Sequence, residues 1–447
     1  LIGNMNNANF SLLRYFTDLG HEAHLYLFEN EGMNDSEHFD WKNDTWNEEK
    51  WKSLIFKTPL INNHIQIYSD NYLKFFIFLL MHKILMRFNL PGKYFFKPGI
   101  FKPGKYMDAL FGEYDFVIGS GIVPALFTFC KTRDLDLFYP YSTGIEFCFS
   151  PASTTNLYER SLFTSPLIKT IVKKVSKIQA KGIKETNLIL NAELSLTKKA
   201  FKKLNKSFLI KPIPLLYLEE FCGQIYPEKI DLIVKQINQQ DFSIIMTSRQ
   251  FWVPSGINKK KWDKLQSKNN HWLIYAFKKF TNKFPDIKTK LFLSEYGKDI
   301  NKTKELILKE KIQDKVIWIP KLQRKWIVIL LKHINVSVGE FYRQKGTIWG
   351  GTALESIACG VPFINSLQFK KNKFLKDFGY ELPPILNANS IEEIEDHLIK
   401  LYKSKKLQES ISRESIKWYL NNNSKKLAQD WIRLLKQNAN NPKTNKD

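Results

Sequence analysis

The chain has 447 residues, of which 43% are hydrophobic and 14% aromatic; this composition excludes a largely disordered protein, and the length favours two domains. Its 68 Lys and Arg residues against 44 Asp and Glu residues give a net charge of +24, which favours phosphate-rich partners such as nucleotides, nucleic acid or anionic membranes. The four cysteines lack CxxC spacing, so they suggest neither a zinc site nor a disulfide framework, and a reducing cytoplasm fits best.

The N-terminal segments alternate like the start of a βαβ unit. A turn at Gly3 and Asn4 follows the end of a strand, and we expect further residues before Leu1. Apolar residues at helical spacing predict a helix over Phe10–Leu19, and His24–Phe28 reads as the next strand. This opening favours a parallel sheet covered by helices.

The segment Tyr72 to Lys105 alternates aromatic and aliphatic residues with lysines and arginines. This pattern is typical of a surface that rests in lipid headgroups, and it predicts peripheral contact with the inner face of the cell membrane. No uninterrupted apolar stretch reaches the length of about 20 residues that spans a bilayer. The alternative, a core helix followed by a basic Pro-Gly loop, stays open.

Three further strands complete the predicted first sheet, over Tyr114–Gly119, Leu137–Tyr139 and Thr186–Asn191. In open parallel sheets, ligands gather at the carboxyl ends of the strands. We therefore expect one crevice, the acceptor site, to be lined by the residues that follow these strands. They are Gly3, Asn4, Gly119, Thr143, Gly144 and Glu146.

The proline-punctuated segment Lys211–Pro214 reads as a linker, after which the alternation restarts. The expected strands of the second half are Phe242–Met246, Thr289–Ser294, Val316–Ile319, Ile334–Val338, Val361–Asn365 and Pro384–Leu386. Ser390 and Glu393 form a capping box that opens a helix to Leu401. The pattern predicts an α/β protein of two Rossmann-like, doubly wound domains, 1–213 and 214–414. A helix over 415–437 is expected to return to the first domain, before a disordered tail at 438–447.

The segment Gly346–Ile364 carries the strongest functional signal. Gly350 and Gly351 let the backbone approach a ligand closely, and a helix from Thr352 directs free amide groups and the positive end of its dipole at it. A diphosphate suits this place. Glu355 lies one turn into the helix, where a carboxylate can accept hydrogen bonds from ribose hydroxyls.

This segment resembles the donor-site motif of the retaining glycosyltransferase family four, often called group 1. That motif has a Glu, seven residues and a second Glu before Ala-x-Ala-x-Gly-x-Pro. Glu355 matches the second Glu and Gly350 the internal glycine, whereas Thr347 occupies the place of the first Glu. In the family the first carboxylate contacts the donor sugar, so either Glu340 substitutes for it, or sugar recognition differs, or activity is weakened.

The resemblance extends upstream over most of the second half. Arg249 and a lysine among residues 259 to 261, Lys259 or Lys260 in particular, are similar to the family's clamp on the donor pyrophosphate. Leu322 lies in a loop that in the family contacts the nucleotide base. The loop at Gly3 and Asn4 is similar to the one that approaches the donor phosphates.

The resemblance implies a GT-B fold, with the two domains facing a cleft, and retaining transfer of a sugar, of hexosyltransferase type, from a nucleotide-diphosphate sugar. The acceptor would be a glycan or a lipid-linked acceptor, in cell-surface polysaccharide or lipopolysaccharide biosynthesis. No metal and no cofactor are expected. A non-catalytic GT-B subunit and a sugar-nucleotide epimerase remain as alternatives. Nucleic acid is not expected as a partner, because the basic residues form no recognition helix.

Overall fold

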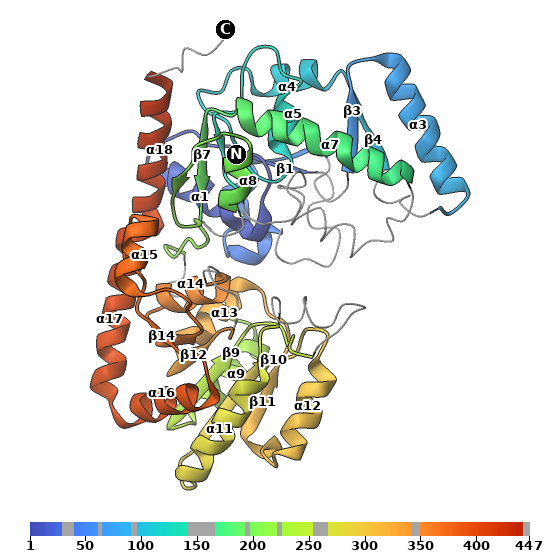
Figure 1. The fold of residues 1–447 in the computed structure, drawn as a ribbon. Coiled ribbons are helices and arrows are strands. Elements are labelled where there is room, and N and C mark those ends of the chain that lie inside the picture. Colours follow the sequence, from blue (N-terminus) through green and yellow to red (C-terminus); the bar gives the residue numbers. More distant parts are fainter. Residues whose placement is uncertain are drawn as a thin grey trace. The chain divides into compact units, whose positions relative to one another are not determined.

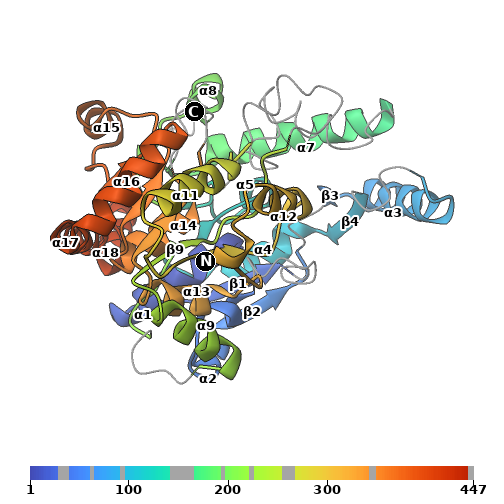
Figure 2. The same cartoon turned by 90° about the horizontal axis from the view of Figure 1, so that it is seen from below.

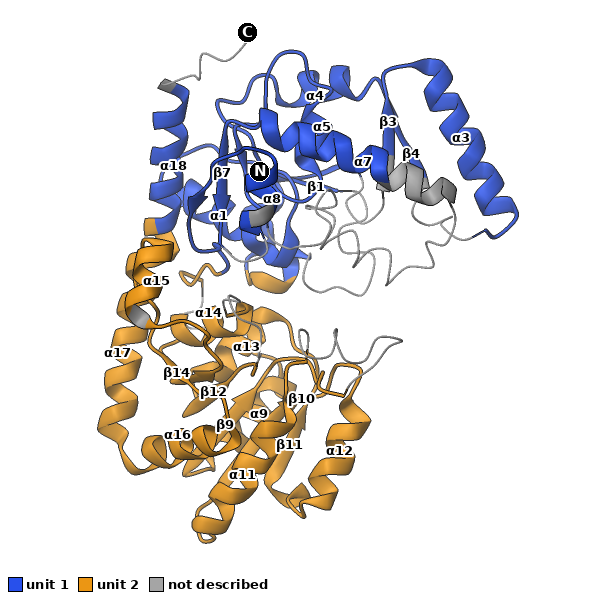
Figure 3. Cartoon of the chain, viewed as in Figure 1, with its two compact units in different colours: residues 1–42, 47–215, 427–447 blue, residues 43–46, 216–426 orange. Residues whose placement is uncertain are grey.

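A computed structural model describes residues 1–28, 40–60, 65–90, 96–140, 166–192, 197–220, 226–253, 267–341 and 349–440. The chain divides into two compact units (Figure 3). Unit 1 comprises residues 1–42, 47–215 and 427–447, and unit 2 comprises residues 43–46 and 216–426. The first long segment of unit 1 ends at Leu215, two residues beyond the boundary expected after Ile213.

Unit 2 is built on a six-stranded parallel sheet with the strand order β11-β10-β9-β12-β13-β14 (Figure 1). The strands are β9 (Phe242–Met246), β10 (Thr289–Ser294), β11 (Val316–Ile319), β12 (Val336–Val338), β13 (Phe363–Asn365) and β14 (Ile385–Asn387). In sequence order this is the arrangement 3-2-1-4-5-6 of doubly wound folds. The chain therefore reverses its direction of winding between β9 and β12, and this switch point is where such folds bind ligands.

Helices cover both faces of this sheet because its strands alternate between two cores. Phe242, Ile244 and Met246 of β9 lie in a core with helices α11 and α16, whereas Ile245 lies in a second core with α9 and α13. Burial on both faces explains why these strands read as continuous apolar runs. The helices of unit 2 are α9 (Glu228–Asn238), α11 (His271–Lys283), α12 (Ile300–Lys309), α13 (Arg324–Leu331), α14 (Gly351–Ala358), α15 (Lys371–Phe378), α16 (Ile391–Lys403) and α17 (Lys405–Asn422).

Unit 1 is also built on parallel strands. Its strands are β1 (Leu25–Phe28), β2 (Ile55–Thr58), β3 (Ile65–Ser69), β4 (Phe96–Phe101), β5 (Ile118–Gly119), β6 (Leu137–Phe138), β7 (Leu188–Asn191) and β8 (Leu209–Ile210). Ile2 pairs with both Tyr26 of β1 and Gly119 of β5, so it joins the pair β1-β2 to the four strands β5-β6-β7-β8. Strands β3 and β4 form a separate parallel pair.

The helices that the structure describes in unit 1 are α1 (Ala8–Asp18), α2 (Glu48–Lys52), α3 (Tyr72–Arg87), α4 (Pro103–Phe111), α5 (Val123–Phe127), α7 (Pro166–Glu185), α8 (Thr197–Lys203) and α18 (Ser424–Asn440). Helices α4, α5, α7 and α8 share a core with β1, β6 and β7. Helix α18 enters this unit from Leu427 and buries Trp431 beside Tyr139, with 5.0 Å between the ring centroids. None of the helices within the described ranges is both long and apolar enough to cross a bilayer.

The structure differs from the sequence-based expectation at three elements. The strand expected over 114–119 is reduced to β5, because side chains bind the backbone of the residues before it: Asp136 accepts from the amide of Val117 at 2.8 Å, and Arg133 donates to the carbonyl of Asp115 at 3.3 Å. The single helix expected over 415–437 is two helices, α17 and α18. Ser424 has a φ of +54°, and its amide donates to the side chain of Asn423, which ends the helical repeat. Where the alternative interpretation of Tyr72 to Lys105 placed a basic Pro-Gly loop, the structure has strand β4 and helix α4.

Candidate donor site

Arg249 lies three residues beyond the end of β9, at the carboxyl edge of the unit 2 sheet. Its side chain is exposed, and its guanidinium lies 5.7 Å from the centroid of the Phe251 ring. The ammonium of Lys298 lies 4.1 Å from the same ring. Two cations thus share the space around one aromatic side chain, just where the strand order switches.

Lys268 joins the loop after β9 to the loop after β12. Its amide donates to the carbonyl of Phe251 at 2.8 Å, and its own carbonyl accepts from the amide of Phe341 at 3.0 Å. Its side chain is buried and forms an ion pair with Glu340. Asn270, two residues later, accepts from the amide of Phe251 at 2.9 Å and fixes the same loop. The backbone therefore holds Lys268 firmly at the switch point.

The electrostatics of this cluster favour an anionic ligand. Burial and the neighbouring charge of Arg249 lower the pKa of the Lys268 ammonium to about 7. Arg249 and Lys268 bring two positive charges against the single carboxylate of Glu340, so a bound anion would relieve the repulsion between Arg249 and Lys268. A diphosphate carries the charge and the oxygen atoms that such a pair of cations binds.

Glu355 lies at the same edge of the sheet, one turn into α14. Its Oε1 accepts from Nε of Arg324 at 3.0 Å, and Nη1 of Arg324 lies 3.3 Å from Oδ2 of Asp44. Arg324 begins α13, directly after the loop that follows β11. Burial raises the pKa of Glu355, and the guanidinium of Arg324 counteracts this shift. Arg324 therefore holds two buried carboxylates, and it fixes the side chain that the sequence assigns to the ribose.

The N-terminus of α14 follows β12 at the switch point. Gly350 has a φ of −84°, and a Cβ atom at this position would meet no atom within 4 Å. Neither the backbone of Gly350 nor the packing of the described residues requires a glycine here, which leaves close approach of a ligand as a physical reason for it. Ser356 ties the helix to the sheet, because its Oγ donates to the carbonyl of Thr352 at 2.8 Å and lies 2.9 Å from Oγ of Ser337.

The structure brings together some of the residues expected at the donor site. Arg249 and Glu340 share the cluster around Lys268, and Gly350, Gly351, Thr352 and Glu355 share the first turns of α14. Leu322 packs against the core formed with α9 and α13. Lys259, Lys260 and Thr347, together with Thr143, Gly144 and Glu146 of the acceptor crevice, lie outside the described residues.

In unit 1, Gly3 and Asn4 lie at the carboxyl end of the segment that pairs with β1 and β5. Gly3 has a φ of +82°, which favours glycine, and the side chain of Asn4 is buried. Its Oδ1 accepts from the amide of Phe10 at 3.0 Å, and its Nδ2 donates to Asn7 at 2.7 Å. Asn4 thus organises the start of α1.

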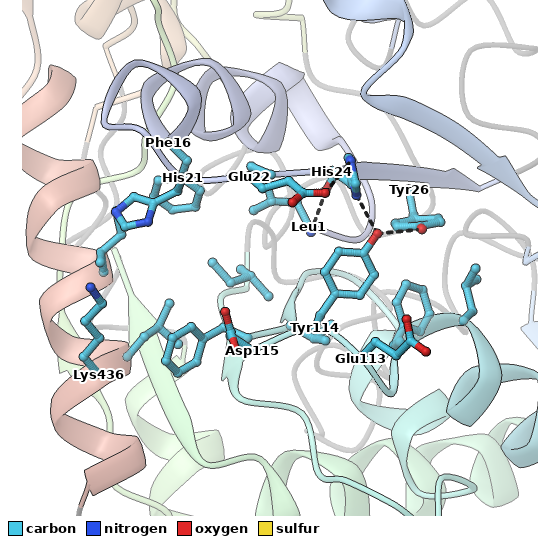
Figure 4. Close-up of a pocket in the computed structure, with 18 of the residues that line it drawn as sticks. Leu1, Phe16, His21, Glu22, His24, Tyr26, Glu113, Tyr114, Asp115 and Lys436 are labelled. Carbon is cyan, nitrogen blue, oxygen red and sulfur yellow. Dashed lines mark hydrogen bonds and ion pairs between the residues drawn. The ribbon is translucent and has the colours of Figure 1, made fainter.

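A cavity of about 560 Å³ in unit 1 lies at the opposite, amino-terminal edge of the sheet. Figure 4 shows Tyr114 between His24 and Tyr26; its hydroxyl lies 2.6 Å from Nδ1 of His24 and 2.9 Å from the hydroxyl of Tyr26. Because parallel sheets of this type bind their ligands at the carboxyl ends of the strands, we do not assign the acceptor to this cavity.

Sequence reasoning missed Lys268 and Arg324. Lys268 stands three residues before the apolar helix α11, and Asn269 after it has a φ of +46°, the left-handed conformation in which Asn is common. A lysine directly before a buried helix is therefore a feature by which the sequence could have indicated Lys268. The sequence pattern instead favoured the lysines at 259 to 261 as the clamp on the donor pyrophosphate. Arg324 carried no such signal, since its partners are distant in sequence.

Comparison with known proteins supports this reading of the fold. Residues 264–418 match the family model for glycosyl transferases group 1. No curated protein matches the chain in sequence. Among solved structures, a glycosyltransferase from Rickettsia africae is 12% identical, with 98% of this chain and 96% of that chain covered and a TM-score of 0.52.

Two other solved structures share the fold. HepE from Anabaena, in complex with UDP and glucose, is 11% identical, with 98% of both chains covered and a TM-score of 0.54. The N-terminal domain of a trehalose-6-phosphate phosphatase from Candida albicans is 14% identical, with 97% of this chain and 94% of that chain covered and a TM-score of 0.55. Such low identities establish the fold and leave the chemistry to the site.

The parallel sheets of the two units define an α/β protein with the GT-B fold. Within that fold, residues 264–418 carry the similarity to the glycosyl transferases group 1 family.

Proposed function

We propose that this chain transfers a sugar, with retention of configuration, from a nucleotide-diphosphate sugar to a glycan or lipid-linked acceptor. The observation that carries the proposal is the pairing of Arg249 with buried Lys268 at the switch point of unit 2. UDP-sugars are the first donors to test, since HepE was crystallised with UDP-glucose. A role in the biosynthesis of cell-surface polysaccharide or lipopolysaccharide, at the cytoplasmic face of the membrane, suits such an acceptor.

In this proposal the protein mainly stabilises the leaving group. Arg249 and Lys268 neutralise the diphosphate as its bond to the anomeric carbon breaks, and amide groups at Gly351 and Thr352 add donors at the positive end of α14. Glu355 accepts from the ribose hydroxyls through the oxygen that Arg324 does not bind. The departing diphosphate takes the proton of the acceptor hydroxyl, so neither a metal nor a cofactor is needed.

Glu340 is the candidate to supply the carboxylate that the family motif has at the position of Thr347. It lies beside Lys268, so a donor whose diphosphate binds Lys268 would bring its sugar near Glu340. Lys268 takes the part of the clamp that was expected of Lys259 or Lys260, and these two remain additional candidates.

The proposal predicts that incubation with a UDP-sugar and a glycan or polyprenyl-phosphate-linked acceptor releases UDP and forms a glycosylated product. Mass spectrometry of the product and a coupled assay for UDP measure the two together. A sugar-nucleotide epimerase would instead change the configuration of the sugar while it stays on the nucleotide. Donor binding without turnover across an acceptor panel would favour the non-catalytic subunit, which the threonine at 347 makes the second candidate.

A further inference from the structure

Helix α3 carries apolar side chains on two faces, one packed on unit 1 and one open to solvent. The inner face packs on unit 1 through Phe78, Met81 and Leu85, which lie in a small core with β3, α5 and α7. The outer row, defined as Leu73, Ile77, Leu80 and Ile84, has the spacing i, i+4, i+7 and i+11, so its members share one side of the helix.

The outer row is open to solvent. Its side chains are 43% to 67% exposed, and Phe76 and Phe88 beside it are 52% and 65% exposed. Single exposed apolar residues are ordinary on protein surfaces, whereas a continuous row on one helix marks an interaction surface. Figures 1 and 2 both show α3 at the outer end of unit 1, beside β3 and β4. The row therefore has the position and the access to meet a large partner.

The charges on α3 and on the segment that follows it are positive. Between residues 71 and 107 the sequence has seven Lys or Arg residues and no Asp or Glu. By helical spacing, Lys74 and Lys83 flank the outer row on opposite sides. Helix α7 adds a second basic surface, with Lys174 exposed and its ammonium 5.3 Å from the centroid of the Phe78 ring in α3. An apolar row between basic flanks is complementary to a surface with an apolar interior and anionic headgroups.

We propose that the outer row of α3 docks this protein on an anionic lipid bilayer, with the helix lying in the plane of the headgroups. The apolar side chains would enter the boundary with the acyl chains, and the flanking lysines would reach the phosphates. Stable peripheral binding needs two signals, and α3 supplies both in one helix. The surface belongs to unit 1 and does not depend on the donor site, so docking and transfer can succeed or fail separately.

Co-sedimentation of the full chain with vesicles tests this docking surface. We expect binding to phosphatidylcholine vesicles that contain phosphatidylglycerol, much weaker binding to phosphatidylcholine alone, and weaker binding to the anionic vesicles at high salt. The double variant Leu73→Glu, Leu80→Glu should lower partitioning about tenfold or more, because two apolar contacts are lost and two negative charges gained.

The matched control is Leu232→Glu, Leu308→Glu, which changes two leucines of similar exposure, 53% and 61%, on helices α9 and α12. It should sediment like the unaltered chain, and circular dichroism should show both double variants folded. Equal binding of the two double variants, or no binding of the unaltered chain to anionic vesicles, would overturn the proposal. So would light scattering that shows a dimer which only the α3 variant dissociates, since a second copy would then cover the row.

Discussion

Replacing Lys268 with alanine is expected to lower kcat/KM for sugar transfer by at least about 100-fold, in the range seen when one charge-stabilising group is removed from an active site. The variant loses a cation that lies beside Arg249 and is held between two loops at the switch point. Initial rates of UDP release, measured against the unaltered chain, give this number.

A control separates chemistry from stability, because Lys268→Ala also leaves Glu340 buried without its ion-pair partner. The double variant Lys268→Ala, Glu340→Gln removes that charge, so we expect it to recover thermal stability. Because Glu340 is itself a candidate contact of the donor sugar, the reference for its activity is Glu340→Gln alone, and we expect the double variant to stay far less active than that single variant. Recovery of activity in the double variant would contradict the role of Lys268 in holding the diphosphate.

Because the pKa of Lys268 is lowered, the pH dependence of nucleotide-sugar binding is a second test of its role. A nucleotide sugar binds the charged lysine, so its affinity should be greatest below pH 7 and should fall as the pH rises through about 7, where the free protein loses that proton. The pyrophosphate of a nucleotide sugar does not titrate in this range, which makes it the appropriate ligand. In Lys268→Ala this dependence should vanish.

Replacing Arg324 with alanine is expected to cost about 3–5 kcal/mol of stability, the usual effect of removing one partner from a buried ionic network. The side chains of Arg324, Asp44 and Glu355 are 11%, 1% and 8% exposed, so solvent can replace little of what is lost. Urea unfolding followed by circular dichroism measures the loss.

The pH dependence of that loss identifies its cause. Burial raises the pKa of Glu355 in the folded chain, and Arg324 counteracts this shift. Without Arg324, the pKa of Glu355 in the folded variant should therefore lie further above its pKa in the unfolded chain. Between those two pKa values the folded variant binds more protons than the unfolded one, so the variant should gain stability as the pH falls. Arg324→Lys keeps the charge but loses the second donor, and we expect an intermediate cost. A loss below 1 kcal/mol that does not vary with pH would argue against the network.

Much of the fold could be predicted because local patterns determine it. Strands β9, β10 and β11 lie where continuous apolar runs placed them, since each is buried between two layers of helices. Ser390 caps α16 as its motif predicts, with its Oγ accepting from the amide of Glu393 at 3.2 Å. Strands β12 and β13 begin two residues later than expected, because periodicity defines the ends of short strands poorly.

The electrostatic clusters could not be predicted from spacing. Lys268 pairs with Glu340 across 72 positions, and Arg324 meets Asp44 across 280, so only the strand order brings these side chains together. The motif around Glu355 could be found because its residues lie on one helix and act through its N-terminus. Packing determines which lysine lies at the proposed diphosphate site. Lys268 could be identified only from its burial and its backbone hydrogen bonds.

The most direct test of the account is calorimetric titration of UDP-, GDP- and ADP-sugars into the unaltered chain, into Arg249→Ala and into the control Arg413→Ala, an exposed arginine on α17. We predict that at least one nucleotide sugar binds the unaltered chain and the control with equal affinity, and that Arg249→Ala abolishes this binding. Undiminished binding to Arg249→Ala, or no binding of any of the three donors to the unaltered chain, would contradict a diphosphate site at the switch point of unit 2.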